Sequence, residues 1–298
     1  MSEDKKADAS VCCASCGIAE IDDIKLTDCG GCDLVKYCSD ECQRNHTTEH
    51  KEDCNKRAAE LRVEILFKQP ESTHLEDCPI CSLPLSLDRS KSSMYNCCSK
   101  LICKGCSYAN RKRQSEMRLE QTCPFCREPL PENGEETGKR RRKRLEANDP
   151  LSMCQEGIKQ YKQGDYTRAF EYWSKAAELG DADAHFRLAW LYQNDEVVEK
   201  DERKEIHHLE EAVIAGHPIA RFSLGCNEWN KGNIEKAVKH WVIAATQGQD
   251  DAMKKLMDGF RDGYVSKEKL TATLRAYQAA VDATKSPQRK EAEECFKV

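Results

Sequence analysis

Cysteine is the residue type in this sequence whose spacing could do chemistry. Sixteen of the 19 cysteines lie before residue 127, and most of these stand in pairs separated by two residues. A C-x2-C pair places two thiolates on the same side of a tight turn, as a tetrahedral zinc ion requires. Residues 1–9 are polar and charged and do not resemble a signal peptide, so we expect a reducing compartment, where metal binding is favoured over disulfides.

The first group of ligands, within residues 12–54, matches the needs of two ions without remainder. It offers seven thiolates and one imidazole, eight donors for two four-coordinate zinc ions. Gly30 and Gly31 lie inside the second C-x2-C pair, where a ligand-bearing turn needs permissive backbone angles. The predicted donors are Cys13, Cys16, Cys29, Cys32, Cys38, Cys42, His50 and Cys54.

This group resembles the MYND zinc finger in residue types and in spacing. The resemblance is carried by Tyr37-Cys38-Ser39, by Cys42-Gln43 and by the run from His50-Lys51 to Cys54. MYND fingers bind proline-containing peptides or abut a SET methyltransferase domain, and no domain of that size follows here, so methyl transfer is not supported. A zinc knot that serves only to fold the segment is the alternative. The family topology implies one zinc on Cys13, Cys16, Cys38 and Cys42 and another on Cys29, Cys32, His50 and Cys54, with Cys12 competing as the first ligand.

A second group of eight cysteines lies between residues 78 and 126. Three C-x2-C pairs and the adjacent pair Cys97-Cys98 provide donors for two further zinc ions, about four per chain in all. Adjacent residues in an extended chain point to opposite sides, so Cys97 and Cys98 can share one ion only if the backbone turns between them. The members of this group are Cys78, Cys81, Cys97, Cys98, Cys103, Cys106, Cys123 and Cys126.

The layout of the second group resembles a RING finger, from its first C-x2-C pair to its last Cys-Pro-x-Cys. The histidine common in that family falls at Lys100 here, so the resemblance implies the all-cysteine version. Ile80, Pro124 and Arg127 match the positions through which RING fingers contact a ubiquitin-conjugating enzyme and ubiquitin. The crossed topology of the family implies one zinc on Cys78, Cys81, Cys103 and Cys106 and another on Cys97, Cys98, Cys123 and Cys126.

The RING resemblance implies a ubiquitin-protein ligase that has no catalytic nucleophile of its own. Such a ligase orients the thioester-linked conjugate so that a substrate lysine can attack, which is a proximity effect. The alternative is a non-catalytic adaptor, in which zinc is structural and all the modules bind protein partners. A transcription regulator is disfavoured, because the net charge is -5 and neither finger type indicates DNA contacts.

The C-terminal half contains an internal repeat with a period of 36 and then 32 residues, seen by aligning the five-residue turns that begin at Gly180, Gly216 and Gly248. Such a period predicts helix pairs that bury their apolar stripes on their neighbours. The pattern over residues 150–260 resembles Sel-one-like repeats, relatives of tetratricopeptide repeats. Large apolar residues stand seven positions before each glycine and four positions after each turn: Trp173, Leu188, Leu209, Leu224, Trp241 and Leu256.

Together these patterns predict a multidomain chain, with two small zinc-stabilised modules of little regular structure followed by an all-α helical-repeat solenoid. A charged fraction of 33% and a mean hydropathy of -0.77 agree with several small cores rather than one large core. The expected segments are a disordered N-terminus (1–11), a MYND-type finger (12–54), a helical connector (55–72), a RING-type finger (73–131), a charged linker (132–148), repeats with a capping helix (149–284) and a tail (285–298).

Six consecutive basic residues, Lys139 to Arg144, lie in the expected linker and are either a nuclear-import signal or an ordinary solvated run. No aromatic side chain lies in the run to stack a base, so we do not expect nucleic acid to bind. No stretch of about 18 apolar residues indicates a membrane span. The expected partners are a ubiquitin-conjugating enzyme and protein or peptide ligands of the MYND finger and repeats, in the cytoplasm, the nucleus or both.

Overall fold

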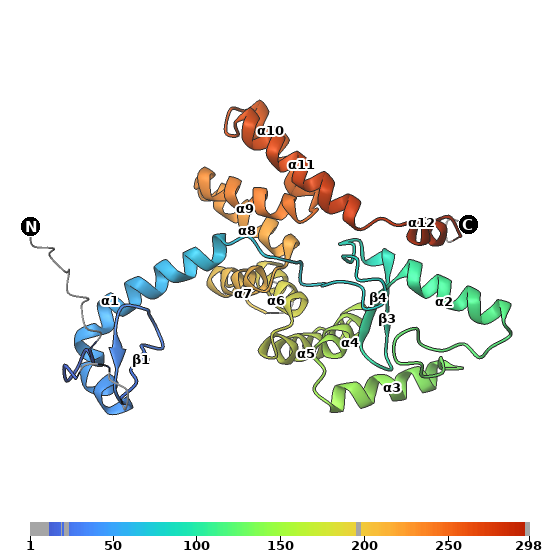
Figure 1. The fold of residues 1–298 in the computed structure, drawn as a ribbon, viewed down its shortest axis with the longest axis horizontal. Helices are drawn as coiled ribbons and strands as arrows, with labels where there is room; N and C mark the ends of the chain where they lie inside the picture. The colour runs from blue at the N-terminus through green and yellow to red at the C-terminus, as the bar shows by residue number, and fades with distance from the viewer. Residues whose placement is uncertain (1–11, 19, 21–23, 195–197, 296–298) are drawn as a thin grey trace, which may run out of the picture. The chain divides into compact units, whose positions relative to one another are not determined.

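The computed structural model describes residues 12–18, 20, 24–194 and 198–295 (Figure 1). The chain divides into two compact units, residues 1–68 and 69–298, which are described separately. The disordered N-terminus predicted for residues 1–11 lies outside the described residues. No helix of the described part is long and apolar enough to cross a membrane.

The first unit contains the N-terminal module, residues 12–54, and one long helix. Strands β1 (Thr27–Asp28) and β2 (Lys36–Tyr37) pair antiparallel, and α1 runs over Asp40–Phe67. The hydroxyl of Ser39 accepts a hydrogen bond from the backbone N–H of Cys42 and so caps the helix. The helix thus begins before the last three metal donors of the module, Cys42, His50 and Cys54. The helix expected from residue 55 therefore begins fifteen residues earlier, inside the module, because the cap lies at Ser39.

The central module, residues 73–131, is built on one hairpin and one helix. Strands β3 (Ser92–Tyr95) and β4 (Lys100–Cys103) pair antiparallel, and α2 (Lys104–Glu116) follows β4 directly. A single 3-10 turn, η1 (Arg89–Lys91), precedes β3. Cysteine sulfurs pack with Leu85, Tyr95 and Ile102 in its small core, so zinc ligands and apolar core are one cluster.

Residues 132–148, expected as a linker, contain helix α3 (Gly134–Glu146). Asn133 caps it by accepting from the N–H of Glu136, and acidic residues in its first turn precede basic residues in its last turn, which suits the helix dipole. An ion pair four residues apart joins Glu135 to Lys139 at 2.9 Å. The glycine content and high charge of this segment favour a linker, whereas its cap residue and the order of its charges, acidic first and basic last, favour a helix.

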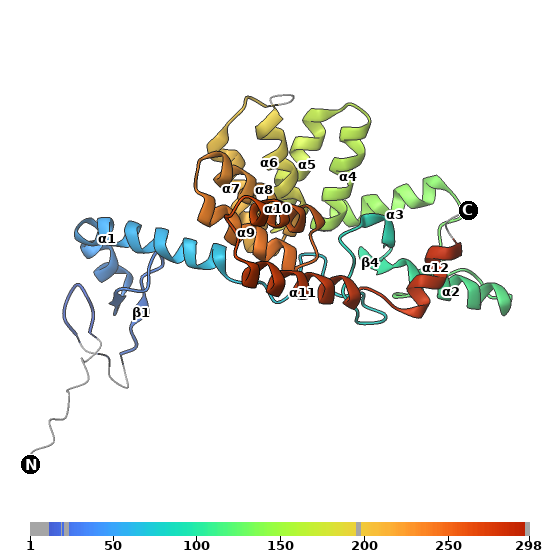
Figure 2. The ribbon, with the colours of Figure 1, turned by 90° about the horizontal axis from the view of Figure 1, so that it is seen from above.

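The repeat array consists of antiparallel helix pairs, as predicted. Trp173 and Trp241 are each 2% exposed, and each faces a glycine of the preceding helix, Gly157 or Gly225, where an added Cβ would lie within 2.6 Å of the indole. These glycines let neighbouring helices approach closely. Figure 2 shows the pairs side by side. The helices are α4 (Pro150–Lys162), α5 (Tyr166–Glu178), α6 (Ala182–Asn194), α7 (Glu202–Ile214), α8 (Pro218–Asn230), α9 (Ile234–Thr246) and α10 (Asp250–Arg261).

Two further helices follow the array. Helix α11 (Lys267–Ala283) packs on α9 and α10, as expected of a capping helix. Residues 285–298, expected as a tail, contain helix α12 (Pro287–Cys295), which packs against α2 of the central module (Figures 1 and 2). The predicted fold class, zinc modules with little regular structure followed by an all-α repeat array, is confirmed.

Candidate zinc centres and the contacts around them

Sixteen side chains that the sequence singled out form four clusters of four donors. In each cluster the donor atoms all lie within 4.8 Å of one another. The grouping is the interleaved and crossed one implied by the two family resemblances. The clusters are Cys13, Cys16, Cys38 and Cys42; Cys29, Cys32, His50 and Cys54; Cys78, Cys81, Cys103 and Cys106; and Cys97, Cys98, Cys123 and Cys126.

The spacing of the sulfur atoms fits tetrahedral zinc. With zinc–sulfur bonds of about 2.3 Å, the edge of a tetrahedron of sulfurs is about 3.8 Å. The Sγ–Sγ distances are 3.7 Å for Cys29–Cys54, 3.8 Å for Cys98–Cys123 and 3.6 Å for Cys16–Cys38. Soft sulfur donors with one imidazole suit zinc better than calcium or magnesium, which take oxygen donors.

In the N-terminal module, α1 supplies three of the donors and also a supporting histidine. His46, one turn before His50, stacks on it with ring centroids 5.7 Å apart, and the hydroxyl of Tyr37 lies 3.1 Å from His46 Nδ1. The i, i+4 spacing of the two histidines was the available signal, and the sequence reasoning missed it. Cys13 is 1% exposed and belongs to the first cluster, whereas Cys12 is exposed and lies outside the clusters.

In the central module, the chain turns between Cys97 and Cys98, which is the condition the sequence set for both sulfurs to reach one ion. The N–H groups of Cys98 and Ser99 both donate to the carbonyl of Tyr95, at 3.2 and 2.8 Å. Ser99 has a φ of 52°, in the left-handed region, which reverses the chain between β3 and β4. Both sulfurs therefore reach Cys123 and Cys126, and Lys100 is exposed on β4, outside the cluster.

The thiols of the central module differ in acidity before any metal binds. Hydrogen bonding by Cys103 and by backbone N–H groups lowers the pKa of the Cys78 thiol to about 4. Burial raises the pKa of Cys98 to about 11 and that of Cys106 to about 12. Zinc binds thiolates, so zinc binding to these clusters must release protons from the cysteines whose pKa is raised.

The residues expected to contact a conjugating enzyme lie at the two ends of the central module. The Ile80 side chain is 43% exposed and Arg127 is exposed, while Pro124 is half-buried beside Phe125, which is also 43% exposed. Two exposed apolar side chains next to zinc-ligand turns are suited to contact a protein partner.

Comparison with protein-family models gives two matches. Residues 13–54 match the MYND finger, and residues 152–181, 182–217 and 230–249 match the Sel1 repeat. The chain carries a MYND finger and Sel1 repeats. The predicted resemblances to the MYND finger and to Sel-one-like repeats are thereby confirmed, and the MYND finger together with the further cysteine clusters indicates zinc binding.

Curated relatives match only parts of the chain. Chitin synthase regulatory factor 4 of Schizosaccharomyces pombe is 31% identical over 86 residues, which is 28% of this chain and 14% of the relative. A putative RING finger protein, ORF96, of Ostreid herpesvirus 1 is 36% identical over 53 residues, 18% of this chain and 22% of the relative. The chain thus spans less than a quarter of the length of either relative.

Among solved structures, a Sel1 repeat protein from Oxalobacter formigenes matches 40% of this chain and 95% of its own, at 28% identity and a TM-score of 0.37. A protective antigen of uropathogenic Escherichia coli with an SLR fold matches 57% of this chain and 37% of its own, at 18% identity and a TM-score of 0.38.

Helix α12 contributes a buried arginine to the first cluster of the central module. Arg289 is 9% exposed and donates to the carbonyls of Pro84 at 2.7 Å and Leu83 at 3.0 Å. Its second terminal nitrogen also lies 3.4 Å from the Cys81 sulfur. The backbone of Arg289 approaches Gly105 so closely that an added Cβ would lie 2.9 Å away. Nothing in the local sequence of the polar tail signalled this contact.

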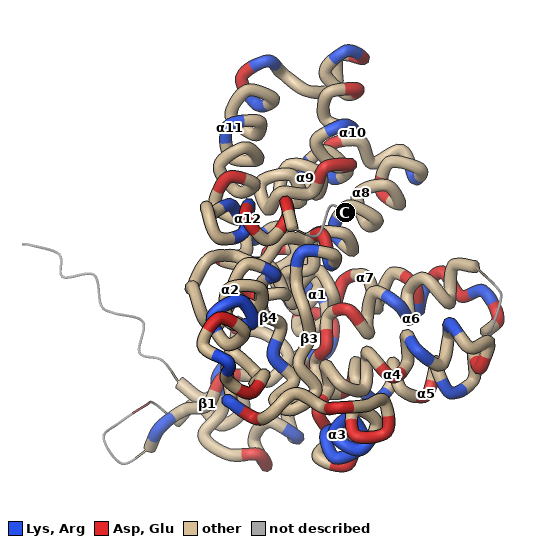
Figure 3. The backbone as a smooth tube through the Cα atoms, turned by 90° about the vertical axis from the view of Figure 1, so that its right-hand side faces the viewer, with Lys and Arg blue, Asp and Glu red and all other residues tan. Residues whose placement is uncertain are grey.

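Three arginines of the basic run make hydrogen bonds or an ion pair with the central module and the Sel1 repeats. Arg144 donates to the carbonyl of Cys97, and Arg140 donates to that of Pro129. Arg141 pairs with Glu156 of α4 at 3.2 Å. Of the remaining basic residues, Arg142 and Lys143 are exposed. Figure 3 shows lysine and arginine positions concentrated on helix α3. Lys139 also pairs with Glu135, so four of the six basic residues are engaged in contacts within the unit.

A buried ion-pair cluster joins the central module to the Sel1 repeats. Asp183 of α6 contacts Arg89, and its Oδ1 lies 3.3 Å from His217 Nε2 and 3.6 Å from His74 Nε2. Three such donors could in principle hold a metal. However, Nδ1 of His217 accepts from the N–H of Ala220 at 3.1 Å, which leaves the ring proton on Nε2, facing the carboxylate. A guanidinium on the same carboxylate also opposes a cation, so the cluster suits a structural junction rather than a metal centre.

Proposed function

We propose that this chain is a zinc-dependent ubiquitin-protein ligase of the RING type, whose MYND finger and Sel1 repeats hold protein partners. The observation that carries the proposal is the turn at Tyr95–Ser99, which brings Cys97 and Cys98 together with Cys123 and Cys126. This turn completes a crossed pair of four-cysteine clusters, as the resemblance to an all-cysteine RING finger leads us to expect. The similarity of 53 residues to a putative viral RING finger protein supports the same reading.

In this proposal four zinc ions bind the four clusters, one to each. The sixteen donors divide between the MYND finger and the central module, and each ion takes four. The metal has a structural role, because a cluster with four protein ligands leaves no open position for water or substrate.

The chemistry proposed for the central module is positioning. Ile80 and Pro124 would contact the conjugating enzyme, and Arg127 would hold the attached ubiquitin in the orientation that a substrate lysine can attack. The thioester bond to the conjugating enzyme breaks and an isopeptide bond to the lysine forms, so this chain supplies no nucleophile.

An autoubiquitination assay with a panel of conjugating enzymes tests the proposal on the full zinc-loaded chain. We expect ubiquitin chains with at least one enzyme of the panel, and loss of the signal in Ile80→Ala and Arg127→Ala without loss of zinc. Leu119→Ala is a matched control, because Leu119 is also exposed, at 51%, but lies between α2 and the last C-x2-C pair and is not within or directly beside a cysteine pair. If folded, zinc-loaded protein gives no ubiquitin chains with any enzyme of the panel, the ligase proposal is wrong.

The second candidate is a non-catalytic adaptor acting in the cytoplasm or nucleus. It is favoured by the match to a MYND finger and Sel1 repeats, both of which are protein-interaction modules. An adaptor would bind the same partners but give no ubiquitin signal, so the assay above separates the two candidates.

A further inference from the structure

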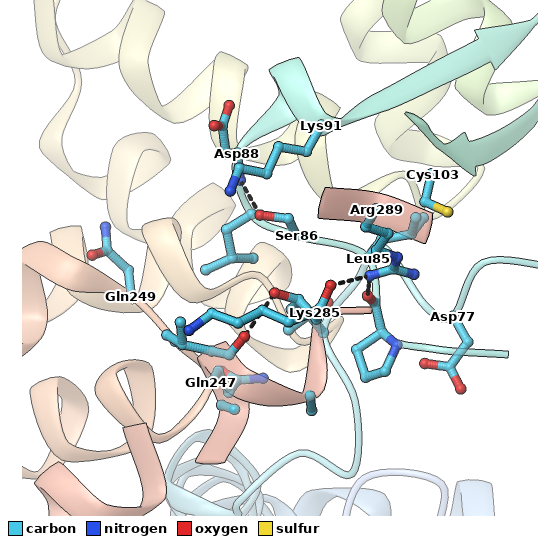
Figure 4. A pocket seen from close by; sticks show the side chains of 18 of the residues that line it. Asp77, Leu85, Ser86, Asp88, Lys91, Cys103, Gln247, Gln249, Lys285 and Arg289 are labelled. Atoms are coloured by element: carbon cyan, nitrogen blue, oxygen red, sulfur yellow. Dashed lines mark hydrogen bonds between the residues drawn. The ribbon is translucent and has the colours of Figure 1, made fainter. Parts of the chain in front are cut away.

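A groove of about 1840 Å³ lies where the central module, the Sel1 repeats and helices α11 and α12 meet (Figure 4). Small-molecule sites have volumes of about 300–1,000 Å³, so this groove is larger than such a ligand needs. Its walls come from segments 69–77 and 84–91 and from segments 246–251 and 280–293, which lie more than 150 residues further along the sequence. Cys103 also lines the groove and Arg289 contacts Cys81, so one wall borders the first cluster of the central module. The proposed conjugating-enzyme contacts, Ile80, Pro124 and Arg127, are not among the lining residues.

The surface beside the groove already binds an irregular segment of this chain. The side-chain amide of Gln247 donates to the carbonyl of Ser72 at 3.3 Å, and the N–H of His74 donates to the carbonyl of Gly216 at 3.0 Å. Gly216 has a φ of 79°, and an added Cβ there would lie 3.1 Å from the carbonyl of Ser72. The turns between repeat helices therefore present groups that recognise polypeptide backbone.

The groove combines apolar side chains with an excess of unpaired carboxylates. Leu85 is buried and Ile219 and Val281 are half-buried along it. Within the described part of the chain, no ion pair or hydrogen bond engages the side chains of Glu71, Glu76 or Asp77 on its rim.

Most cations that line the groove are already engaged. Lys91 pairs with Glu293 at 3.0 Å, and Lys285 pairs with Asp282 at 2.7 Å. Lys290 lies 3.9 Å from Glu294, and the guanidinium of Arg289 donates to the backbone carbonyls of Pro84 and Leu83. The groove is thus complementary to a positively charged ligand and repels nucleic acid.

We propose that the groove binds an unstructured, lysine- or arginine-rich segment of a partner protein. Apolar side chains of that segment would pack on Ile219 and Val281, and its cations would pair with Glu71, Glu76 and Asp77. Backbone contacts like those made by Gln247 would hold it in register. The binding step goes beyond the proposed ligase function, because it needs no ubiquitin transfer.

Fluorescence anisotropy on the full zinc-loaded chain tests this proposal with a labelled probe of about 12 residues that alternates glycine, leucine and lysine. We expect saturable binding that weakens as salt is raised, because exposed charge pairs are screened. A probe with glutamate in place of lysine should not bind, and one with serine in place of leucine should bind more weakly. Equal binding of the glutamate probe would overturn the proposal.

Charge reversal locates the binding. We expect the double variant Glu71→Lys with Glu76→Lys to weaken binding about tenfold or more, with zinc content unchanged. Glu178→Lys, which reverses an exposed carboxylate on α5, should leave the affinity within about twofold. If the reversal does not fold, Glu71→Gln with Glu76→Gln serves in its place, and unchanged affinity in either folded variant rejects this groove as the site.

A second copy of this chain is the competing occupant, since each copy carries its own basic run. Sedimentation of the full chain across a range of concentrations decides between the two. A monomer that binds the probe supports the proposal. A dimer that the Glu71→Lys, Glu76→Lys variant abolishes would overturn it in favour of self-association.

Discussion

The MYND finger and the central module each carry two four-donor clusters, yet the side chains around those clusters come from very different distances along the chain. In the MYND finger, His46 stacks on His50 and Arg57 pairs with Asp33 at 2.7 Å, so the support comes from its own helix α1. In the central module, Arg289 reaches Cys81 from 208 positions away. Contacts from a neighbouring helix allow a zinc finger to fold as a separate unit. Contacts from a residue far along the chain make the module depend on the folding of the segments that lie between them in sequence.

Removing zinc should have the largest effect, because it should unfold the cysteine-rich core of the MYND finger and spare the apolar core of the Sel1 repeats. The buried residues of the MYND finger are largely its ligands, with Leu26 and Tyr37, whereas the Sel1 repeats bury tryptophan, leucine and alanine. Structural zinc contributes about 10–16 kcal/mol to folding in small finger peptides. We expect chelation to unfold residues 24–54 and to leave the repeat helices folded, as followed by hydrogen exchange resolved by segment.

The same measurement on the central module sharpens the comparison. Contacts from α3 and α12 should keep part of its amide protection after chelation, while the MYND finger loses all of it. Equal loss of protection in both modules would show that the distant contacts give no support.

Arg289→Ala should have the next largest effect. It leaves the carbonyls of Leu83 and Pro84 without their donor and opens space beside Gly105, so we expect a loss of about 2–3 kcal/mol in the free energy of unfolding. Arg57→Ala is the matched change in the MYND finger, where the partners are exposed carboxylates, and its effect should be much smaller. Denaturant unfolding measures both, and a larger loss in Arg57→Ala would contradict the comparison.

Asp183→Asn should come third. It removes the negative charge that Arg89 pairs with inside the junction, while the amide oxygen still accepts from His217 Nε2, so we expect a loss of about 2 kcal/mol. Asp28→Asn in the MYND finger breaks an exposed pair with Lys36 and is the control. A thermal shift that is the same for both variants would show that the junction is no stronger than a surface pair.

A pH effect should be the smallest. Burial lowers the pKa of His74 to about 3 and holds that of His217 well below its usual range, so both are neutral in the native state. The unfolded chain binds these protons as pH falls through about 6.5, so stability is fully present above that value and declines below it. From about pH 7.5 to about pH 6, each histidine should contribute a loss of about 0.8 kcal/mol.

His217→Asn tests this assignment, because asparagine keeps the helix cap of α8 and removes the titrating ring. The pH dependence of unfolding should become shallower in this variant. The groups that face His217 are His74, Arg89, Arg187 and Asp183, and only the histidine at position 74 titrates in the same range. An unchanged slope would assign the pH dependence to other groups.

Sequence reasoning predicted the features that local spacing encodes. The C-x2-C pairs, the glycine turns of the repeats and the cap at Asp149 are each visible within a few residues. It failed at α12 and α3, which were expected to be tail and linker. Helix α12 is stabilised by packing on α2, a contact that no short window contains. For α3, the cap at Asn133 and the order of its charges were present in the sequence but were outweighed by composition.

The close approach of Arg289 to Gly105 also has a consequence for synthesis on the ribosome. At about 5–20 residues per second, roughly ten to thirty seconds separate the appearance of the last zinc-ligating turn of the central module from that of α12. During that interval the module exists with its cysteines, its hairpin and α2 but without its final arginine. A nascent chain that stalls or terminates before residue 289 would therefore release a central module that lacks this support, and such a product would be a natural target for chaperones and proteases.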